Sequence, residues 1–210
     1  MDISIVIPLL NEQNSLEELS SSVSSVINDL NLKYEIILID DGSTDNSWKI
    51  ISKICLKNQH IKGIRFLKNF GKSQALSAGF KACNGDVVIT MDADLQDDPN
   101  EIPELYKKIN EDNFDLVSGW KKVRYDSIIF KNFPSKIFNW AARITSGLKL
   151  NDFNCGIKAY KKEVIQKVKL TGGMHRYIPV LAKNAGYNRI TEKIVIHHPR
   201  KHGKTKYGID

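Results

Sequence analysis

The sequence predicts an α/β fold in which a mainly parallel central sheet is flanked by helices. Short apolar runs, such as Ile3–Leu9 and Val87–Met91, alternate along the chain with amphipathic stretches of ten or more residues. This alternation is typical of βαβ units, whose strands lie parallel. The chain has 210 residues, of which 41% are hydrophobic, so a single domain with a sizeable core accounts for its length.

The individual elements follow from the period of the apolar residues. Short apolar runs predict strands at Ile3–Leu9, Tyr34–Ile39, Gly63–Leu67, Val87–Met91, Phe114–Ser118 and Arg189–His197. Helical spacing predicts one helix that starts at Ser15 and a second that ends near Lys57. It also predicts helices at Gly71–Cys83, Pro99–Asp112, Lys162–Val168 and Tyr177–Gly186. The first helix starts with Ser15-Leu-Glu-Glu18, which has the Ser-x-x-Glu form of a capping box.

The cysteines and the apolar segments exclude several classes of protein. Cys55, Cys83 and Cys155 are odd in number and far apart, which disfavours a disulfide framework or a zinc site and fits a reducing compartment. The N-terminal segment lacks the basic start of a signal peptide, and no window approaches about 18 consecutive apolar residues. We therefore expect neither a secretory signal nor a membrane-spanning helix within this sequence.

The net charge of +7 hides an asymmetry between two parts of the chain. Residues 1–120 carry 11 Lys and Arg against 19 Asp and Glu, whereas residues 121–210 carry 20 against 5. The first part therefore suits a cation, and the second suits phosphate groups or an anionic surface. No nucleic-acid-binding motif accompanies the basic part, so nucleic acid is not an expected partner.

The segment Asp92-Ala93-Asp94 follows the predicted strand at Val87–Met91, and Gln96 lies two residues further on. Residues i and i+2 of an extended segment point the same way, so both carboxylates can face one point beyond the strand. Oxygen ligands of this kind suit Mg²⁺ or Mn²⁺, and no Cys or His lies beside them to indicate zinc. Acidic residues after a strand also occur in turns and helix caps, and this motif alone does not separate the two interpretations.

Polar residues occur at the ends of four predicted strands, at 11–12, 40–41, 92–94 and 119–121. The carboxyl ends of parallel strands share one edge of a sheet, where open α/β folds bind their ligands. Neither a Gly-x-Gly-x-x-Gly nor a GxxxxGK[ST] motif follows a strand, which argues against a dinucleotide-dependent dehydrogenase and a P-loop NTPase. The four clusters therefore predict a ligand site of another kind.

Two segments in the basic part each allow two interpretations. Residues 127–147 place apolar side chains on one helical stripe and Lys and Arg largely on the other, which is typical of an interfacial membrane helix or of an ordinary core-facing helix. The tail from His197 to Gly208 holds four cations and forms either a basic loop or a disordered terminus. Its histidines lie beside these cations, which argues against a metal site there.

Six motifs occur along the chain in a fixed order. They are Pro8-x-x-Asn11-Glu12, Asp40-Asp41-Gly-Ser-Thr-Asp45, Asn69-x-Gly71-Lys72, Met91-Asp-Ala-Asp-Leu-Gln-Asp-Asp-Pro99, Asn151-Asp-Phe-x-Cys-Gly-x-Lys158 and Arg200-x-x-Gly203-x-x-Lys206-Tyr207. On these motifs the chain resembles, over nearly its whole length, the inverting family 2 glycosyltransferases with a GT-A fold. More narrowly, it looks like the polyprenyl-phosphate glycosyltransferases, the group that contains dolichol-phosphate mannose synthase.

The resemblance implies a donor site made of residues from the first part of the chain. The base and ribose pocket of a nucleotide sugar would be lined by Pro8, Glu12, Ile39 and Asp41. Ala93 would contribute by being small beside the nucleotide. The Mg²⁺ or Mn²⁺ ion that bridges its diphosphate would be held by Asp92, Asp94 and Gln96.

The resemblance also implies roles for residues of the second part. Lys121 matches a phosphate-binding position that is often Arg in the family, so bidentate binding is in question here. Arg200 and Lys206 match the basic residues that close over the diphosphate and the acceptor phosphate. Asp152 would orient the acceptor, and would act as a base only if the acceptor were a hydroxyl. A turn or cap role for Asp152 is the alternative.

The implied reaction moves a sugar from a UDP- or GDP-sugar to polyprenyl phosphate, with inversion, at the cytoplasmic face of the cell membrane. Residues 1–120 would be the nucleotide- and metal-binding half of one catalytic domain, 1–210, and residues 121–210 its acceptor- and membrane-facing half. Relatives commonly continue into transmembrane helices, which would lie outside these 210 residues. Two alternatives stay open: a soluble family 2 enzyme acting on a saccharide hydroxyl in cell-surface polysaccharide synthesis, and a non-catalytic sugar-nucleotide-binding module. A homo-oligomer is also left open.

Overall fold

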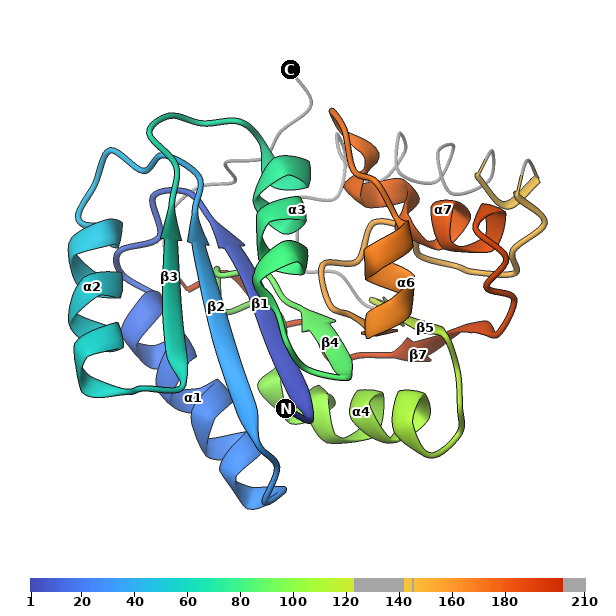
Figure 1. Cartoon of the computed structure of the whole chain (residues 1–210), viewed down its shortest axis with the longest axis horizontal. Coiled ribbons are helices and arrows are strands. Elements are labelled where there is room, and N and C mark those ends of the chain that lie inside the picture. The colour runs from blue at the N-terminus through green and yellow to red at the C-terminus, as the bar shows by residue number, and fades with distance from the viewer. Residues whose placement is uncertain (123–141, 145, 202–210) are drawn as a thin grey trace.

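The fold is built on one twisted sheet with helices on both faces (Figure 1). The computed structural model describes residues 1–122, 142–144 and 146–201. In these ranges the strands are β1 (Ile3–Leu9), β2 (Tyr34–Asp40), β3 (Ile61–Arg65), β4 (Val87–Thr90), β5 (Leu116–Trp120), β6 (Lys158–Lys161) and β7 (Ile190–Ile194). Their order across the sheet is β3-β2-β1-β4-β6-β5-β7. The predicted α/β class with a mainly parallel sheet is confirmed.

One strand was missed from the sequence and runs against the others. β6 lies between β4 and β5 and is antiparallel to both, whereas the β1–β2, β1–β4, β2–β3 and β5–β7 pairs are parallel. Its sequence, Lys-Ala-Tyr-Lys, is only four residues long and has lysines at both ends. Such a segment gives no apolar run, so its place is fixed by pairing with two buried neighbours.

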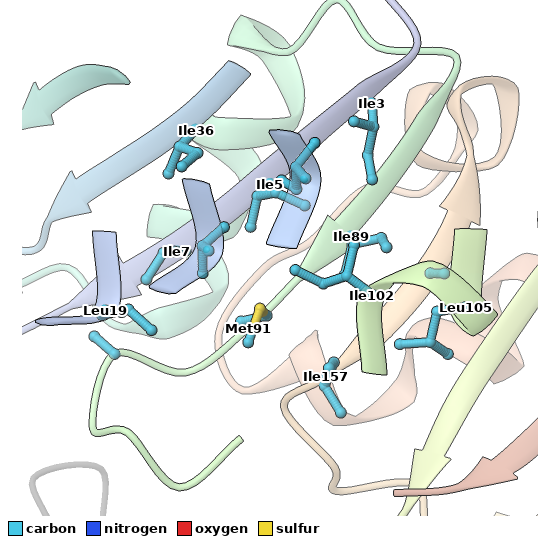
Figure 2. Close-up of a cluster of buried hydrophobic side chains, with 14 of the residues drawn as sticks. Ile3, Ile5, Ile7, Leu19, Ile36, Ile89, Met91, Ile102, Leu105 and Ile157 are labelled. Carbon is cyan, nitrogen blue, oxygen red and sulfur yellow. The ribbon is translucent and has the colours of Figure 1, made fainter. Parts of the chain in front are cut away.

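Helices cover the two faces of the sheet in two separate apolar clusters. One face packs against α1 (Leu16–Asp29), α2 (Ser47–Lys57) and α4 (Ile102–Asn110), and the other against α3 (Lys72–Ala82), α6 (Lys162–Lys167) and α7 (Ile178–Asn184). Figure 2 shows part of the first cluster, with Ile7 of β1 close to Leu19 of α1. Burying one such side chain stabilises the fold by about 1.5–3 kcal/mol. We call the two sides the α1 face and the α3 face.

Strand alternation decides which face each residue meets. In β1, Ile5 and Ile7 belong to the α1-face cluster, and Val6 between them belongs to the α3-face cluster. In β4, Ile89 points to the α1 face and Val88 to the α3 face. Because successive side chains of a strand point to opposite faces, residues 90 and 92 continue the α3-face series.

Several expected boundaries shift, and one expected cap is wrong. Ser15 is the N-cap of α1 but makes no side-chain capping bond; its Oγ donates to the Glu12 carbonyl at 3.0 Å instead. β3 lies two residues earlier than expected, because its pairing with β2 joins Ile36 to Ile61 and reaches the end of β2 when Asp40 pairs with Arg65. The helix expected at 99–112 divides into a 3-10 turn, η1 (Pro99–Glu101), and α4. A second 3-10 turn, η2 (Met174–Tyr177), precedes α7.

Two expectations fall largely outside the described residues. The amphipathic segment 127–147 is described only at 142–144, 146 and 147, and Lys206 is not described. Within the described ranges, no helix is both long enough and apolar enough to cross a membrane.

Candidate active site

The polar clusters predicted at strand ends gather at one edge of the sheet. β1, β2, β4 and β5 point the same way, as their parallel pairs and the shared antiparallel neighbour β6 require. Their carboxyl ends therefore lead into residues 11–12, 41, 92–98 and 121 along a single edge. Ligands of open α/β sheets bind at such an edge, and the described side chains there are mostly charged.

Asp92 lies on the α3 face of this edge and is held by a lysine and a glycine. Lys72, the first residue of α3, forms an ion pair with Asp92 Oδ1. Gly156 packs so closely on the carboxylate that a Cβ there would lie 2.5 Å from Asp92 Cγ and 2.8 Å from Oδ1. The glycine of the Asn151–Lys158 motif therefore provides the space that the Asp92 carboxylate occupies.

The Asp92 carboxylate is kept ionised by the lysines around it. Burial alone raises its pKa, but the positive charges of Lys72 and Lys121 outweigh burial and hold that pKa well below its usual range. Asp92 therefore carries a full negative charge at neutral pH, which Lys72 partly neutralises.

Asp94 meets a different cation, Arg200. The Arg200 guanidinium lies 2.5 Å from Asp94 Oδ2, donates to Gln96 Oε1 at 3.2 Å and stands 3.9 Å from Glu12 Oε1. Burial and the Asp92 charge raise the pKa of Asp94 to about 6, although Arg200 opposes the shift. The edge thus concentrates more negative charge around Asp94 than one guanidinium offsets.

Arg200 reaches this position because residues 197–200 pair with the segment that follows β4. Asp97 and His197 form an antiparallel bridge, and His198 N donates to the Gln96 carbonyl at 2.8 Å. The Gln96 side chain returns a bond, from Nε2 to the His198 carbonyl at 3.3 Å. Gln96 therefore both faces Arg200 and holds the segment that carries it. The structure brings Arg200 to the acidic motif, as the sequence predicted for the start of the basic tail.

Lys121 and Asp152 are both engaged in ordering the edge. Lys121 Nζ lies 2.8 Å from Asp97 Oδ1, and Asp97 Oδ2 accepts from Asp92 N at 3.1 Å. Burial works against the Lys121 ammonium, but the Asp97 carboxylate outweighs it and raises the lysine pKa. Asp152 accepts from Asn154 N at 2.9 Å and from Lys121 N at 3.4 Å. Asp97 is a site residue that sequence reasoning missed, although it stands within the same acidic run.

The residues expected to line the base and ribose pocket are buried at the same edge. Pro8 and Ile39 are register partners in β1 and β2, and Ala93 is 4% exposed. Asp41 accepts from Phe70 N at 2.8 Å and from Gly71 N at 3.0 Å. Asp41 therefore fixes the loop between β3 and α3, and any contact with a nucleotide would be additional to that.

The oxygen donors at Asp94 and Gln96 fit a divalent cation. In the structure they converge on one cationic group, the guanidinium of Arg200, which shows that a positive group is accommodated between them. Hard carboxylate and amide oxygens are the ligands that Mg²⁺ and Mn²⁺ prefer. Among the described residues, no three His, Cys, Asp or Glu side chains are grouped to hold an ion.

An open α/β sheet with an acidic cluster at the carboxyl ends of its strands defines the class of fold, in which ligands bind at that edge. The sequence model of glycosyl transferase family 2 matches residues 4–169. The chain therefore belongs to glycosyl transferase family 2, and its fold is the GT-A fold of solved members.

Two curated relatives are similar to this chain over nearly its whole length. The chain is 36% identical, over 100% of its length, to dodecaprenyl-phosphate galacturonate synthase of Rhizobium johnstonii, of which it covers 62%. It is 39% identical, over 99% of its length, to undecaprenyl-phosphate 4-deoxy-4-formamido-L-arabinose transferase of Shewanella sediminis, again covering 62%. The chain thus spans less than two thirds of these curated relatives.

The fold also matches a solved structure of a phosphoglycerate-modifying enzyme. Glucosyl-3-phosphoglycerate synthase of Mycobacterium tuberculosis, in complex with Mn²⁺ and UDP-glucose, superposes with a TM-score of 0.71. The match covers 96% of this chain and 72% of that one at 21% identity, so it bears on the fold alone.

Proposed function

We propose that the protein transfers a sugar from a nucleotide-sugar donor to a polyprenyl phosphate. The observation that carries the proposal is the meeting of Arg200 with Asp94 and Gln96, which assembles anion- and cation-binding groups at one strand edge. The relatives named for transfer to dodecaprenyl and undecaprenyl phosphate, aligned over nearly the whole chain, support the choice of acceptor. A UDP- or GDP-sugar is the proposed donor, and its sugar is left open.

The donor is proposed to lie across the carboxyl ends of β1, β2 and β4. Its base and ribose would contact the surface formed by Pro8, Glu12, Ile39, Asp41 and Ala93. Mg²⁺ or Mn²⁺ would be held by Asp94 and Gln96 with Asp92 beside them, and would neutralise charge on the diphosphate. The structurally similar glucosyl-3-phosphoglycerate synthase was crystallised with Mn²⁺ and UDP-glucose, which supports this choice of ion.

The reaction is proposed to be a single displacement at the anomeric carbon. An oxygen of the acceptor phosphate forms the new bond, the bond to the donor diphosphate breaks, and the configuration inverts. Arg200, with Lys121 and Lys206, would stabilise the charge that grows on the leaving diphosphate. A phosphate acceptor is already ionised near neutral pH and needs no general base. Asp152, which is buried and bonded to Asn154 N, would then position the acceptor side of the site.

A donor screen followed by a transfer assay tests this function. UDP- and GDP-sugars are screened by thermal shift with Mn²⁺, and the stabilising donor is then incubated with polyprenyl phosphate. We expect a lipid-linked sugar whose formation stops when the ion is chelated. Transfer to a saccharide hydroxyl with none to lipid would favour the soluble alternative, and donor binding without any transfer would favour the non-catalytic one.

A membrane surface is the proposed partner at this edge, on the cytoplasmic side of the cell membrane. Residues 127–147 were expected to provide the contact and lie mainly outside the described residues. Support comes from the loop after β3, where Leu67 is fully exposed and Phe70 is 54% exposed, with the Lys68 ammonium 5.3 Å from the Phe70 ring. Apolar tips flanked by lysine suit an anionic lipid surface.

Vesicle flotation tests the membrane contact with a matched pair of variants. Leu67→Ser removes an apolar side chain at the proposed surface, whereas Leu56→Ser removes one that is 89% exposed near the end of α2, at the opposite edge of the sheet. We expect Leu67→Ser to weaken binding to anionic vesicles by up to about 60-fold, since it removes three carbons at about 0.8 kcal/mol each, and Leu56→Ser to leave it unchanged. Equal vesicle binding by both variants and the wild type would contradict a membrane contact at Leu67.

A further inference from the structure

We propose that Asp97 is a positioning residue for the transfer, which holds Asp92 and Lys121 in place without itself meeting the donor. The inference rests on the proposed function for the group that Lys121 meets, the diphosphate of the donor. Asp97 lies in the segment after β4, three residues beyond Asp94, and is 1% exposed. It is therefore a buried carboxylate in the middle of the acidic run.

The two oxygens of the Asp97 carboxylate have different partners. Oδ2 accepts from the main-chain N of Asp92 at 3.1 Å, which closes the loop between residues 92 and 97. Oδ1 lies 2.8 Å from Nζ of Lys121, the residue directly after β5. The side chains of this ion pair are 0% and 10% exposed. One carboxylate therefore sets the positions of two groups that follow different strands.

The main chain of Asp97 brings a third segment to the same place. It forms the antiparallel bridge with His197, three residues before Arg200. Residue 97 thus contacts the segment after β4, the segment after β5 and the segment that carries Arg200. A change of the Asp97 side chain alters the first two contacts and leaves the main-chain bridge in place.

The position of the Lys121 ammonium depends on the Asp97 charge. Burial lowers the pKa of Lys121, but negative groups raise it overall, and among their charges that of Asp97 has the largest effect, with Asp92 also contributing. A buried charge that loses its partner is left uncompensated. Without the Asp97 charge, Lys121 would therefore be drawn towards Asp92, which already pairs with Lys72. Asp97 keeps Lys121 and Asp92 apart, so that each stays available to the donor.

Asp97→Asn separates the two side-chain contacts. Asn keeps an oxygen that accepts from Asp92 N and loses the charge that holds Lys121. We expect the affinity for UDP or GDP in the presence of Mn²⁺ to fall by about 10- to 100-fold, the effect of one lost hydrogen bond to a charged group. The kcat/KM for the donor should fall by the same factor, and the KM for the acceptor should stay unchanged.

Asp115→Asn is the matched control. Asp115 has the same two contacts, because its Oδ2 accepts from Arg189 N at 3.0 Å and its Oδ1 lies 3.1 Å from Lys161 Nζ. It precedes β5 and so lies at the opposite edge of the sheet from Asp97. This variant should leave nucleotide affinity and both kinetic constants as in the wild type.

Lys121→Met, alone and combined with Asp97→Asn, tests whether Asp97 acts through Lys121. Met removes the charge and keeps a similar length. The double variant removes both charges together, so it leaves no unpaired charge in the interior and keeps the test available if Asp97→Asn alone unfolds. We expect the double variant to bind the nucleotide no more weakly than Lys121→Met, since residues that act as a unit have non-additive effects. An Asp97 that held the ion itself would instead add a further loss of about 10-fold or more.

The outcomes separate this proposal from the proposed function. Normal transfer with unchanged donor constants in Asp97→Asn, whatever its thermal stability, overturns the positioning role and leaves the function standing. Additive losses in the double variant also overturn it. A wild-type protein that binds UDP or GDP through Asp97 and Lys121 but transfers no sugar supports the positioning role and contradicts the function. Binding of neither nucleotide with Mn²⁺ contradicts both.

Discussion

Asp92 and Asp94 are two residues apart but are held by different cations. Asp92 pairs with Lys72 on the α3 face, and Asp94 pairs with Arg200. The sequence predicted that both carboxylates face one point, which is the expectation for a continuing strand. β4 ends at Thr90, and Leu95 has a positive φ of 62°, so the chain turns within the motif. Burial and the Asp92 charge nevertheless raise the pKa of Asp94, so the two carboxylates interact although their cation partners differ.

Gly156→Ala tests the fit of the Asp92 carboxylate. Its Cβ would lie 2.5 Å from Asp92 Cγ, so the carboxylate must shift from its position beside Lys72. We expect turnover to fall by about 100-fold, the effect of a misplacement of about 1 Å. Gly173→Ala is the control, because a Cβ at Gly173 meets no atom within 4 Å. Equal kinetics of the two variants would show that Asp92 tolerates displacement.

Asp94→Asn tests the proposed ion site by a direct binding measurement. Loss of the charge should weaken Mn²⁺ binding by at least about 10-fold, since changes even to outer-shell partners of metal ligands cost that much. Asp112→Asn is the matched control, because Asp112 is exposed and lies beyond α4. Mn²⁺ binding is followed by electron paramagnetic resonance in the presence of UDP or GDP. Unchanged affinity in Asp94→Asn would place the ion elsewhere.

At the scale of elements, residues 197–200 act as a short partner of the segment after β4. The Asp97–His197 bridge, with the reciprocal bonds between Gln96 and His198, places Arg200 over Asp94. The bonds that hold this segment come mainly from the backbone and from Gln96. The position of residues 197–200 therefore does not depend on the Arg200 side chain.

Arg200→Ala should consequently reduce transfer without unfolding the domain. We expect kcat/KM to fall by about 100-fold, as for the loss of one group that stabilises developing negative charge. Lys201→Ala is the control, since its ion pair with Glu18 is exposed and contributes about 0–1 kcal/mol. Transfer rates and thermal unfolding are measured on both. A large loss of stability in Arg200→Ala would make the residue structural.

The elements differ in how well the sequence predicts them. β1 ends where its apolar run ends, at Leu9, because all of its residues are buried, and α2 ends at Lys57 as the helical spacing predicted. β6 could not be found, since it has no apolar run and its partners, β4 and β5, are far away in sequence, as is the Asp115 partner of Lys161. The capping box failed because Ser15 bonds backward to Glu12, whose position depends on Ser47 of α2.

The residues of the candidate site were also predicted only in part from the sequence. Its acidic motif and Arg200 were found because each is a local pattern of residue types. Asp97 and Gly156 were not assigned roles, because their significance depends on contacts with Lys121 and Asp92 that only the tertiary structure makes. Local sequence therefore predicts which groups carry charge, whereas tertiary contacts decide which groups share a site.

At the scale of the whole molecule, the strand order joins the acidic and basic parts of the chain. β6 and β7 come from the basic part, yet β6 lies between β4 and β5 of the acidic part. This interleaving brings Lys158, from the basic part, to the α3 side of Asp92, and residues 197–200 return Arg200 to Asp94. The proposed reaction, in which one anion attacks and another leaves, needs this mixture of charges at one edge.

The most direct measurement is mass spectrometry of the lipid after incubation with the stabilising nucleotide sugar and Mn²⁺. The proposed function predicts a polyprenyl phosphate heavier by one sugar residue, formed in step with one nucleoside diphosphate, and no such product with Asp94→Asn. A wild-type protein that binds the donor and Mn²⁺ but leaves the lipid unmodified with every UDP- and GDP-sugar would contradict it.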